Sequence, residues 1–177
     1  MTIPSITATV PSVGGPTSDT VSWSPSGSTS FASTLTLIAV FAAFAARPVP
    51  DSNEAHYLAK AKHNWDATWC AGDFFLQSAD VHQAFYWSIG WLTKFFPLMT
   101  VAWIGRCIGW LCLAIGWQRL HTAVGGPRSL AWLTAIVLAL LSDNLQMANE
   151  WFIGGIEAKV FAWAAIFLAA AAVAENR

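Results

Sequence analysis

The stretch VHQAFYWSIGWLTKFFPLMTVAWIGRCIGWLCLAIGW, from Val81 to Trp117, decides how this chain folds. It is nearly all apolar and would be roughly 55 Å long as one helix, whereas a single crossing of a bilayer needs only about 20 residues. Pro97 divides the stretch, because proline lacks a backbone N–H and disfavours helix in the residue before it. The sequence therefore predicts a short interfacial or re-entrant helix over Ala84–Phe96 and a membrane span over Leu98–Trp117.

Three more apolar runs lie outside this stretch: Phe31–Ala46 before it, and Ser129–Met147 and Trp151–Ala174 after it. The chain of 177 residues is 55% hydrophobic and only 11% charged, whereas about a quarter of the residues of a soluble domain are charged. The low charge indicates a membrane protein, and so do its 11 tryptophans, because indole rings collect at membrane–water interfaces. The predicted fold is all-α: a polytopic membrane protein with about four transmembrane helices, and with interfacial or amphipathic helices in the first large loop.

The chain divides into a polar tail and an apolar domain. Residues 1–28 are rich in Ser, Thr, Pro and Gly and are predicted to be disordered. No lysine or arginine precedes Arg47, so a signal or transit peptide is not indicated. Residues 29–177 form the predicted helical membrane domain, multi-pass in the cell's inner or plasma membrane, with the lipid bilayer as its surroundings. The net charge of −1, without a basic cluster, argues against nucleic-acid binding.

The first large loop carries a helical pattern that Asp51 and Glu54 open. Its apolar face holds Leu58, Ala61, Trp65 and Trp69, and its polar face holds His56, Lys60 and His63. We expect an amphipathic helix that lies on the membrane surface. No two of the loop's histidines have the spacing that places a pair on one metal ion, so neither a metal site nor a cofactor is predicted.

Acidic residues gather in two segments of the chain. If there are four spans, segments 47–97 and about 143–158 lie on the same membrane face, whichever way the protein is inserted. Eight of the ten acidic residues lie there: Asp51, Glu54, Asp66, Asp73, Asp80, Asp143, Glu150 and Glu157. One face is therefore predicted to be acidic. Lysines and arginines occur near both faces, so the positive-inside rule does not fix the orientation.

The motif Pro50–Tyr57 follows the first predicted span and contains two acids. A carboxylate just above the membrane can act as a general base; Glu54 is the candidate, with Asp51 beside it. The same two residues have the spacing of a capping box, in which a glutamate reaches back to the backbone at the start of a helix. The catalytic and the capping interpretations can hold together.

Two further charged residues lie in apolar runs. Arg106 is roughly 12 Å into the predicted second span, where a buried arginine is costly. We expect it to meet an acid, with snorkelling to the interface as the alternative. Glu157 follows Gly154-Gly155, which lets backbone or a ligand approach closely. Residues two apart on a helix diverge, so Glu157 is not expected to pair with Lys159. We predict instead a pair between Arg106 and Glu157; the alternative is a helix that begins near Glu157, with its charges in water.

The layout of residues 30–177 resembles the GT-C glycosyltransferases, membrane enzymes that take sugars from polyprenyl-phosphate donors. The shared pattern is an early span, an acidic motif after it, a loop with interfacial helices and a second acidic motif two spans later. Asn53-Glu54-Ala55-His56-Tyr57 is similar to their first-loop motif, often an Asp-Glu pair near an aromatic residue, and Glu150–Lys159 to a later acidic motif of the outer face. Asn53 stands where such enzymes often have an acid.

The resemblance implies transfer of a sugar from a polyprenyl-phosphate donor to an acceptor on the extracytoplasmic face. Glu54 would take the acceptor's proton, Arg106 would hold the donor's phosphate or fix an acid in place, and Glu157 would shape the site. The motif residues Lys159, His56 and Tyr57 would complete substrate binding. Such enzymes have many more than four spans, so the chain is expected to be the N-terminal part of one. The alternative is a non-catalytic membrane subunit or small transporter component, whose surface helix binds a protein partner.

Overall fold

The computed structural model of the chain describes residues 31–51, 53–79, 81–145 and 153–176. Within these ranges all regular structure is helical, as the sequence predicted. The predicted disordered tail, 1–28, lies outside the described residues. The helices in chain order are α1 (Phe31–Ala45), α2 (Glu54–Trp65), α3 (Phe74–Gln77), α4 (Gln83–Trp87), η1 (Gly90–Lys94), α5 (Leu98–Ala123), η2 (Arg128–Leu130), α6 (Ala131–Leu145) and α7 (Ala158–Glu175).

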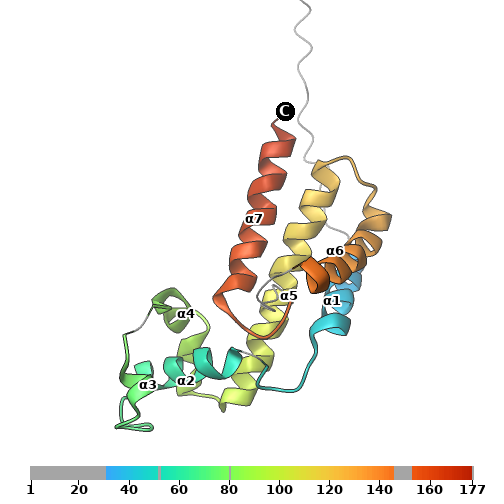
Figure 1. The fold of residues 1–177 in the computed structure, drawn as a ribbon. Coiled ribbons are helices and arrows are strands. Elements are labelled where there is room, and N and C mark those ends of the chain that lie inside the picture. The colour runs from blue at the N-terminus through green and yellow to red at the C-terminus, as the bar shows by residue number, and fades with distance from the viewer. Residues whose placement is uncertain (1–30, 52, 80, 146–152, 177) are drawn as a thin grey trace, which may run out of the picture.

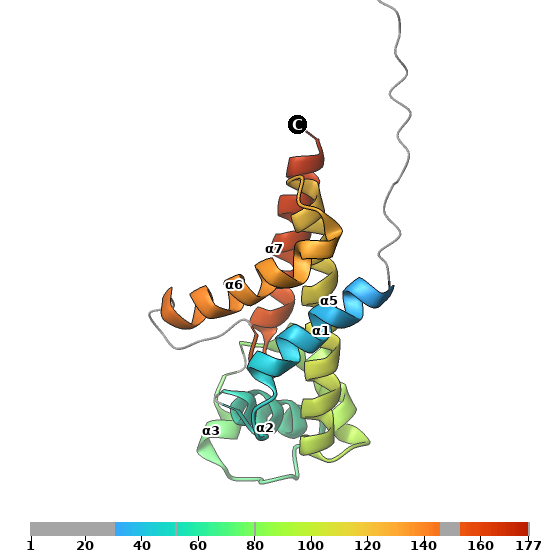
Figure 2. The ribbon, with the colours of Figure 1, turned by 90° about the vertical axis from the view of Figure 1, so that its right-hand side faces the viewer.

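Two long helices, α5 and α7, lie side by side through the molecule (Figures 1 and 2). Both are long and apolar enough to cross a membrane, judged by length and composition. The 26 residues of α5 extend about 39 Å and the 18 residues of α7 about 27 Å. α1 and α6 are also apolar, but each has 15 residues, whereas a crossing needs about 20. The structure therefore gives a spanning length to two of the four predicted spans.

Glycines on α5 allow α7 to pack closely against it. A Cβ atom on Gly105 would lie 2.5 Å from Cγ1 of Ile156, just before α7, and one on Gly116 would lie 2.9 Å from the backbone oxygen of Ala164. Both separations are too short for a real side chain, so only glycine fits. Since the residue numbers rise together along the contact, the two helices are parallel. α1 and α6 pack across this pair (Figure 2) and complete a core with Leu37, Phe41, Leu113 and Phe167.

The C-terminal end of α5 differs from the prediction, because the helix continues past Trp117 to Ala123. Polar residues in the added turns have partners inside the protein. Gln118 accepts a hydrogen bond from Thr34 Oγ1 at 3.1 Å and donates one to Ser33 Oγ at 2.6 Å. These hydrogen bonds satisfy the side-chain amide of Gln118 inside the protein. The helix can therefore continue through Gln118, although its polarity indicated the end of the span.

The head, residues 47–97, gathers α2, α3, α4 and η1 at the N-terminal end of α5 (Figure 1). Its core joins α2 and α4 to the first two turns of α5 through Leu58, Ala61, Phe85, Tyr86, Val101 and Ala102. The beginning of α5 is therefore part of the head as well as part of the long helix pair.

The amphipathic helix of the first loop is present as α2, with two corrections. Leu58 and Ala61 are buried as predicted, but α2 ends at Trp65, so Trp69 lies beyond it. Lys60, predicted on the polar face, is buried. Its ammonium donates to the backbone and hydroxyl oxygens of Ser78, at 3.1 and 2.9 Å. These acceptors compensate the lost hydration, and a segment eighteen residues further along the chain supplies them, so the helical pattern alone cannot show them.

The predicted continuous helix over Ala84–Phe96 is two short pieces, α4 and η1. The indole Nε1 of Trp65 donates to the carbonyl oxygen of Tyr86 at 2.9 Å, an oxygen that would otherwise accept the N–H of Gly90 in a continuing helix. Gly90 itself lies against α2, where an added Cβ would be 2.8 Å from the Cβ of Ala61. Contact with α2 therefore breaks this helix.

Candidate functional site

A buried ion pair joins the head to α5. Glu54 is 0% exposed and Arg106 is 1% exposed. Arg106 Nε donates to Glu54 Oε1 at 2.9 Å and Nη2 donates to Oε2 at 2.7 Å, which makes a bidentate, charge-assisted pair. Arg106 Nη1 donates to the carbonyl of Arg47, and the guanidinium lies 4.8 Å from the ring centre of Trp103. The prediction that Arg106 meets an acid is confirmed, and the snorkelling alternative is wrong.

The Glu54 carboxylate also accepts two backbone hydrogen bonds. The N–H of Ile156 donates to Oε1 at 2.8 Å and that of Asp51 to Oε2 at 3.0 Å. With Arg106, four donors occupy the two oxygens, and an ionised carboxylate offers about four lone-pair sites. The bond from Asp51 is the backbone half of the predicted capping box. This geometry supports the capping interpretation of Glu54 and leaves no lone pair for an acceptor's proton.

The bond from Ile156 brings the second acidic segment against the first. A Cβ on Gly155 would lie 3.1 Å from Glu54 Oε1, so the absence of a side chain lets the backbone approach, as expected for this glycine pair. The end of α1, the start of α2, the third turn of α5 and the residues before α7 all meet here. The segment just before α7 thus contacts the first acidic segment, whereas the expectation that both segments share one membrane face stays a prediction.

Glu157 is not the partner of Arg106, contrary to the prediction. It precedes α7 in an extended conformation, with φ −139° and ψ 160°, and its Oε2 lies 2.9 Å from the Nζ of Lys159. The expectation that these two residues do not pair was also wrong, because it assumed that both lie within a helix. α7 begins at Ala158 rather than at Trp151, and residues 146–152 lie outside the described part of the chain. The start of α7 agrees with the alternative reading, but the Glu157 side chain is only 7% exposed and is not in open water.

A pocket of about 510 Å³ lies beside the first two turns of α2, and its volume is in the range of small-molecule sites. The His56 ring lies 5.2 Å from that of Phe75, and the Tyr57 ring lies 4.4 Å from that of His82. Two predicted binding residues, His56 and Tyr57, therefore line one pocket. The lining is Asn53, His56, Tyr57, Lys60, Phe75, Ser78, Ala79, Val81, His82 and Tyr86.

Asp51 lies between the buried pair and the surface. Its backbone N–H is bound to Glu54 and its side chain is half-buried. Within the described ranges, its carboxylate has no hydrogen bond or ion pair to another residue. Of the two acids predicted to act on the acceptor, Asp51 is therefore the one whose carboxylate is not already bonded among the described residues.

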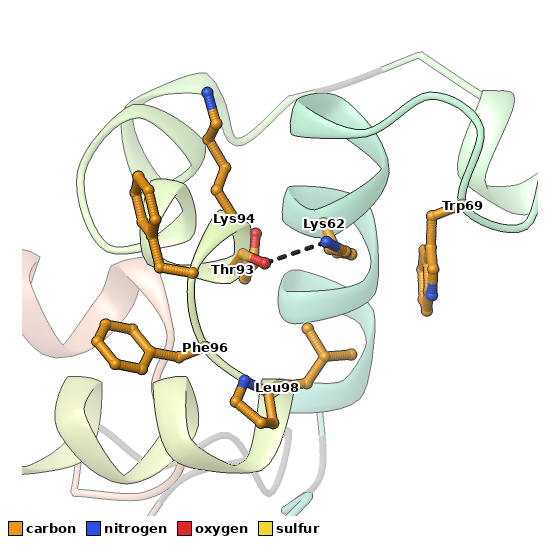
Figure 3. Close-up of a pocket in the computed structure, with 8 residues that line it drawn as sticks. Lys62, Trp69, Thr93, Lys94, Phe96 and Leu98 are labelled. Atoms are coloured by element: carbon orange, nitrogen blue, oxygen red, sulfur yellow. Dashed lines mark hydrogen bonds between the residues drawn. The ribbon is translucent and has the colours of Figure 1, made fainter.

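A second pocket, of about 370 Å³, lies between α2 and segment 93–98 (Figure 3). The ammonium of Lys62 donates to the carbonyl of Thr93 at 3.2 Å, and that of Lys94 extends away from Lys62, 4.9 Å from the ring centre of Trp65. Both lysines already have contacts within the head, and none of the predicted site residues lines this pocket. We assign no function to it.

Two contributors to the site carry no residue-type signal, because they are backbone groups: the N–H of Ile156 and the carbonyl of Arg47. The Gly154-Gly155 pair marks the close approach at Ile156, whereas nothing in the sequence marks Arg47. Comparisons of the chain with models of protein families, with curated proteins and with solved structures found no match.

Proposed function

We propose that the chain is a membrane-embedded part of a glycosyltransferase that resembles the GT-C class. It would move a sugar from a polyprenyl-phosphate donor to an acceptor on the extracytoplasmic face, with α1, α5, α6 and α7 as its four spans. The observation that supports this proposal is that four chain segments meet at one end of the apolar helices, three of them with charged side chains. The phosphate of a lipid-linked donor would reach this protein at the same end of the apolar helices.

The buried pair has a positioning role in this proposal. Glu54 and Arg106 fix the head against α5, because both side chains are almost fully buried and form an ion pair with each other. Arg106 therefore holds an acid in place rather than the donor's phosphate. The cations nearer the solvent are Arg47, which is exposed, and Lys159, whose side chain is 28% exposed. These two side chains would stabilise the negative charge of the phosphate.

Asp51 is the proposed general base. Its carboxylate would accept the proton of the acceptor hydroxyl while the hydroxyl oxygen forms a bond to the anomeric carbon of the sugar. The bond between that carbon and the phosphate oxygen breaks, and the polyprenyl phosphate leaves with the electron pair. The pocket beside α2, whose lining includes Asn53, would receive the acceptor through His56 and Tyr57.

The experiment measures transfer of radiolabelled sugar from polyprenyl phosphates in membranes that carry the chain in its complete reading frame. Asp51→Asn should lower the rate by about a hundredfold or more, because a positioned base is lost. Asp73→Asn is the matched control: Asp73 caps α3 by accepting the N–H of Leu76 at 3.0 Å, a task that asparagine also performs. Equal activity of the two variants would refute the role of Asp51, and no transfer from any donor would refute the enzyme.

One observation favours a second function, that of a non-catalytic membrane subunit. All the acceptor sites of Glu54 are used inside the protein, as expected of a structural joint. Under this alternative the head binds a protein partner, and Asp51→Asn has no effect on any transfer reaction. Cross-linking of the head to a second protein, together with a normal rate for Asp51→Asn, would favour the subunit over the enzyme.

A further inference from the structure

The charged side chains on the long helices, with their partners, occupy two levels. The first holds the pairs Glu54–Arg106 and Glu157–Lys159, and the second holds the pair Arg119–Glu175, with 2.8 Å between Nη2 and Oε2. Between these levels, positions 107–118 of α5 and 160–174 of α7 contain no charged residue. The two helices therefore share an uncharged layer with a charged boundary at each end.

α1 connects the same two levels. Near its start, Thr34 donates to Gln118, the neighbour of Arg119 on α5. Just after its end, the carbonyl of Arg47 accepts from Arg106. α1 itself, Phe31–Ala45, contains no charged residue. Three helices thus extend across the same uncharged layer, and their uncharged lengths give its thickness.

The layer is thin. Arg106 and Arg119 are 13 residues apart on α5, a rise of about 20 Å. The 15 residues of α1 rise about 22 Å, and the 18 residues of α7 rise about 27 Å. The hydrocarbon core of a typical bilayer is about 30 Å thick. The uncharged stretch of α5 and the whole of α1 and of α7 are therefore each shorter than that core, by a few ångströms to about a third of its thickness.

Arg106 cannot widen the layer by snorkelling. A free arginine can extend its guanidinium several bonds toward water, but this one is held by both oxygens of Glu54 and by the carbonyl of Arg47. The boundary at this end is therefore fixed. The first two turns of α5 lie beyond it, with Val101 and Ala102 packed in the core of the head. Arg106 is thus deep in a helix but at the edge of the uncharged layer.

We infer that the lipid-facing belt of this protein fits a thin bilayer, made of lipids with short acyl chains. The occupant of the belt is lipid because its exposed side chains are large and apolar, as at Ile108, Leu111, Ile115 and Ile166. The mismatch with a thicker hydrocarbon layer has to be met by bilayer thinning or by helix tilt, each of which costs free energy. The inference depends on the membrane part of the proposed function and not on sugar transfer.

The test is thermal stability in vesicles of one lipid class and increasing chain length: dimyristoleoyl, dipalmitoleoyl, dioleoyl, dieicosenoyl and dierucoyl phosphatidylcholine. The full chain should have its highest melting temperature in one of the two shortest lipids, and the melting temperature should fall steadily toward the longest. A maximum in dioleoyl or a longer lipid would overturn the inference. Extraction of the chain from membranes by alkaline carbonate would instead refute the membrane proposal itself, so the two failures are distinguishable.

A matched pair of variants tests the boundary. The double change Arg119→Leu with Glu175→Leu removes the second charged level and lengthens the apolar belt, so the optimum should move to the next longer lipid. Lys62→Gln with Asp66→Asn removes an ion pair of the head, 3.7 Å between Nζ and Oδ2, and should leave the optimum unchanged. An optimum that stays in place in the first variant, or moves in the second, would overturn the assignment.

A second measurement does not depend on those variants. In a chain without its native cysteines, an environment-sensitive nitrobenzoxadiazole label is placed on Met99→Cys or on Ile108→Cys. Both side chains are exposed on α5, on opposite sides of Arg106. The label at 99 should emit as in water and the label at 108 as in hydrocarbon. A hydrocarbon-like emission at 99 would place the boundary at the start of α5 and make the belt thick.

Discussion

Removing either member of the Glu54–Arg106 pair should destabilise the protein strongly. Arg106→Met leaves a carboxylate that is 0% exposed without its cation, although the N–H groups of Asp51 and Ile156 still bind it. Glu54→Gln leaves the arginine charge unpaired and turns an amide NH₂ toward a backbone N–H. Loss of one partner of a buried pair costs about 3–5 kcal/mol, and we expect the lower end for Arg106→Met and the upper end for Glu54→Gln. The double variant should cost about 2 kcal/mol less than the sum.

The assay is the free energy of unfolding of the purified chain in mixed micelles, measured by titration with dodecyl sulfate across the four members of the cycle. The comparison cycle pairs Arg106→Met with Glu157→Gln, because the carboxylate of Glu157 contacts Lys159 and not Arg106. It should show a clearly smaller coupling. A coupling below about 0.5 kcal/mol for Glu54 and Arg106, or an equal one for Glu157 and Arg106, would refute the reasoning.

The other predictions concern topology, packing and charge. An impermeant thiol reagent should label the exposed Cys70 of the head from one side of the membrane, and a chain with Asn176→Cys and its native cysteines replaced by serine from the other side only; labelling of both from one side would contradict the four-span proposal. Gly116→Val should lower the free energy of unfolding by about 1–3 kcal/mol, because a Cβ there would lie 2.9 Å from the backbone of α7; an unchanged midpoint would mean that the helices are further apart. The hydroxyl of Thr68, at 2.6 Å, holds the pKa of Asp66 below its ordinary 3.8. This contribution to stability is present above that pH and is lost as the pH falls through the lowered pKa, so Thr68→Val should raise the Asp66 pKa in a carbon NMR titration.

The elements that the sequence predicted well are those with a local cause. Pro97 ends the irregular segment, and α5 begins directly after it at Leu98. Glu54 begins α2, because its carboxylate reaches back to the N–H of Asp51 within one turn. Both signals lie within a few residues of the boundary that they set, so no knowledge of the packing is needed. The breaks that were missed, such as the one between α4 and η1, come from contacts with residues far along the chain.

The partner of Arg106 shows where a sequence-based prediction stops. The expectation that segments 47–97 and 143–158 share one membrane face limits the partner to acids of that face, and Glu54 and Glu157 both qualify. The choice between them depends on the course of the chain before α7, which turns Glu157 toward Lys159 and presents the N–H of Ile156 to Glu54. That course is set by the close packing of Gly105 on Ile156. Neither a charge pattern nor a hydropathy pattern contains this information.

The hydrogen bonds of Glu54 also set an order of events during synthesis. Its donors are made at very different times: Asp51 precedes it, Arg106 follows 52 residues later and Ile156 follows 102 residues later. At about 5–20 residues per second, the ribosome reaches Ile156 about 5–20 s after Glu54. Arg106 is available only for the second half of that interval, and until Ile156 is made the ion pair and the apolar core can hold the head to α5 with one acceptor site on the carboxylate still empty. A nascent chain that stops before α7 would therefore carry a docked but incompletely bonded head, which quality-control factors at the membrane could distinguish from the finished one.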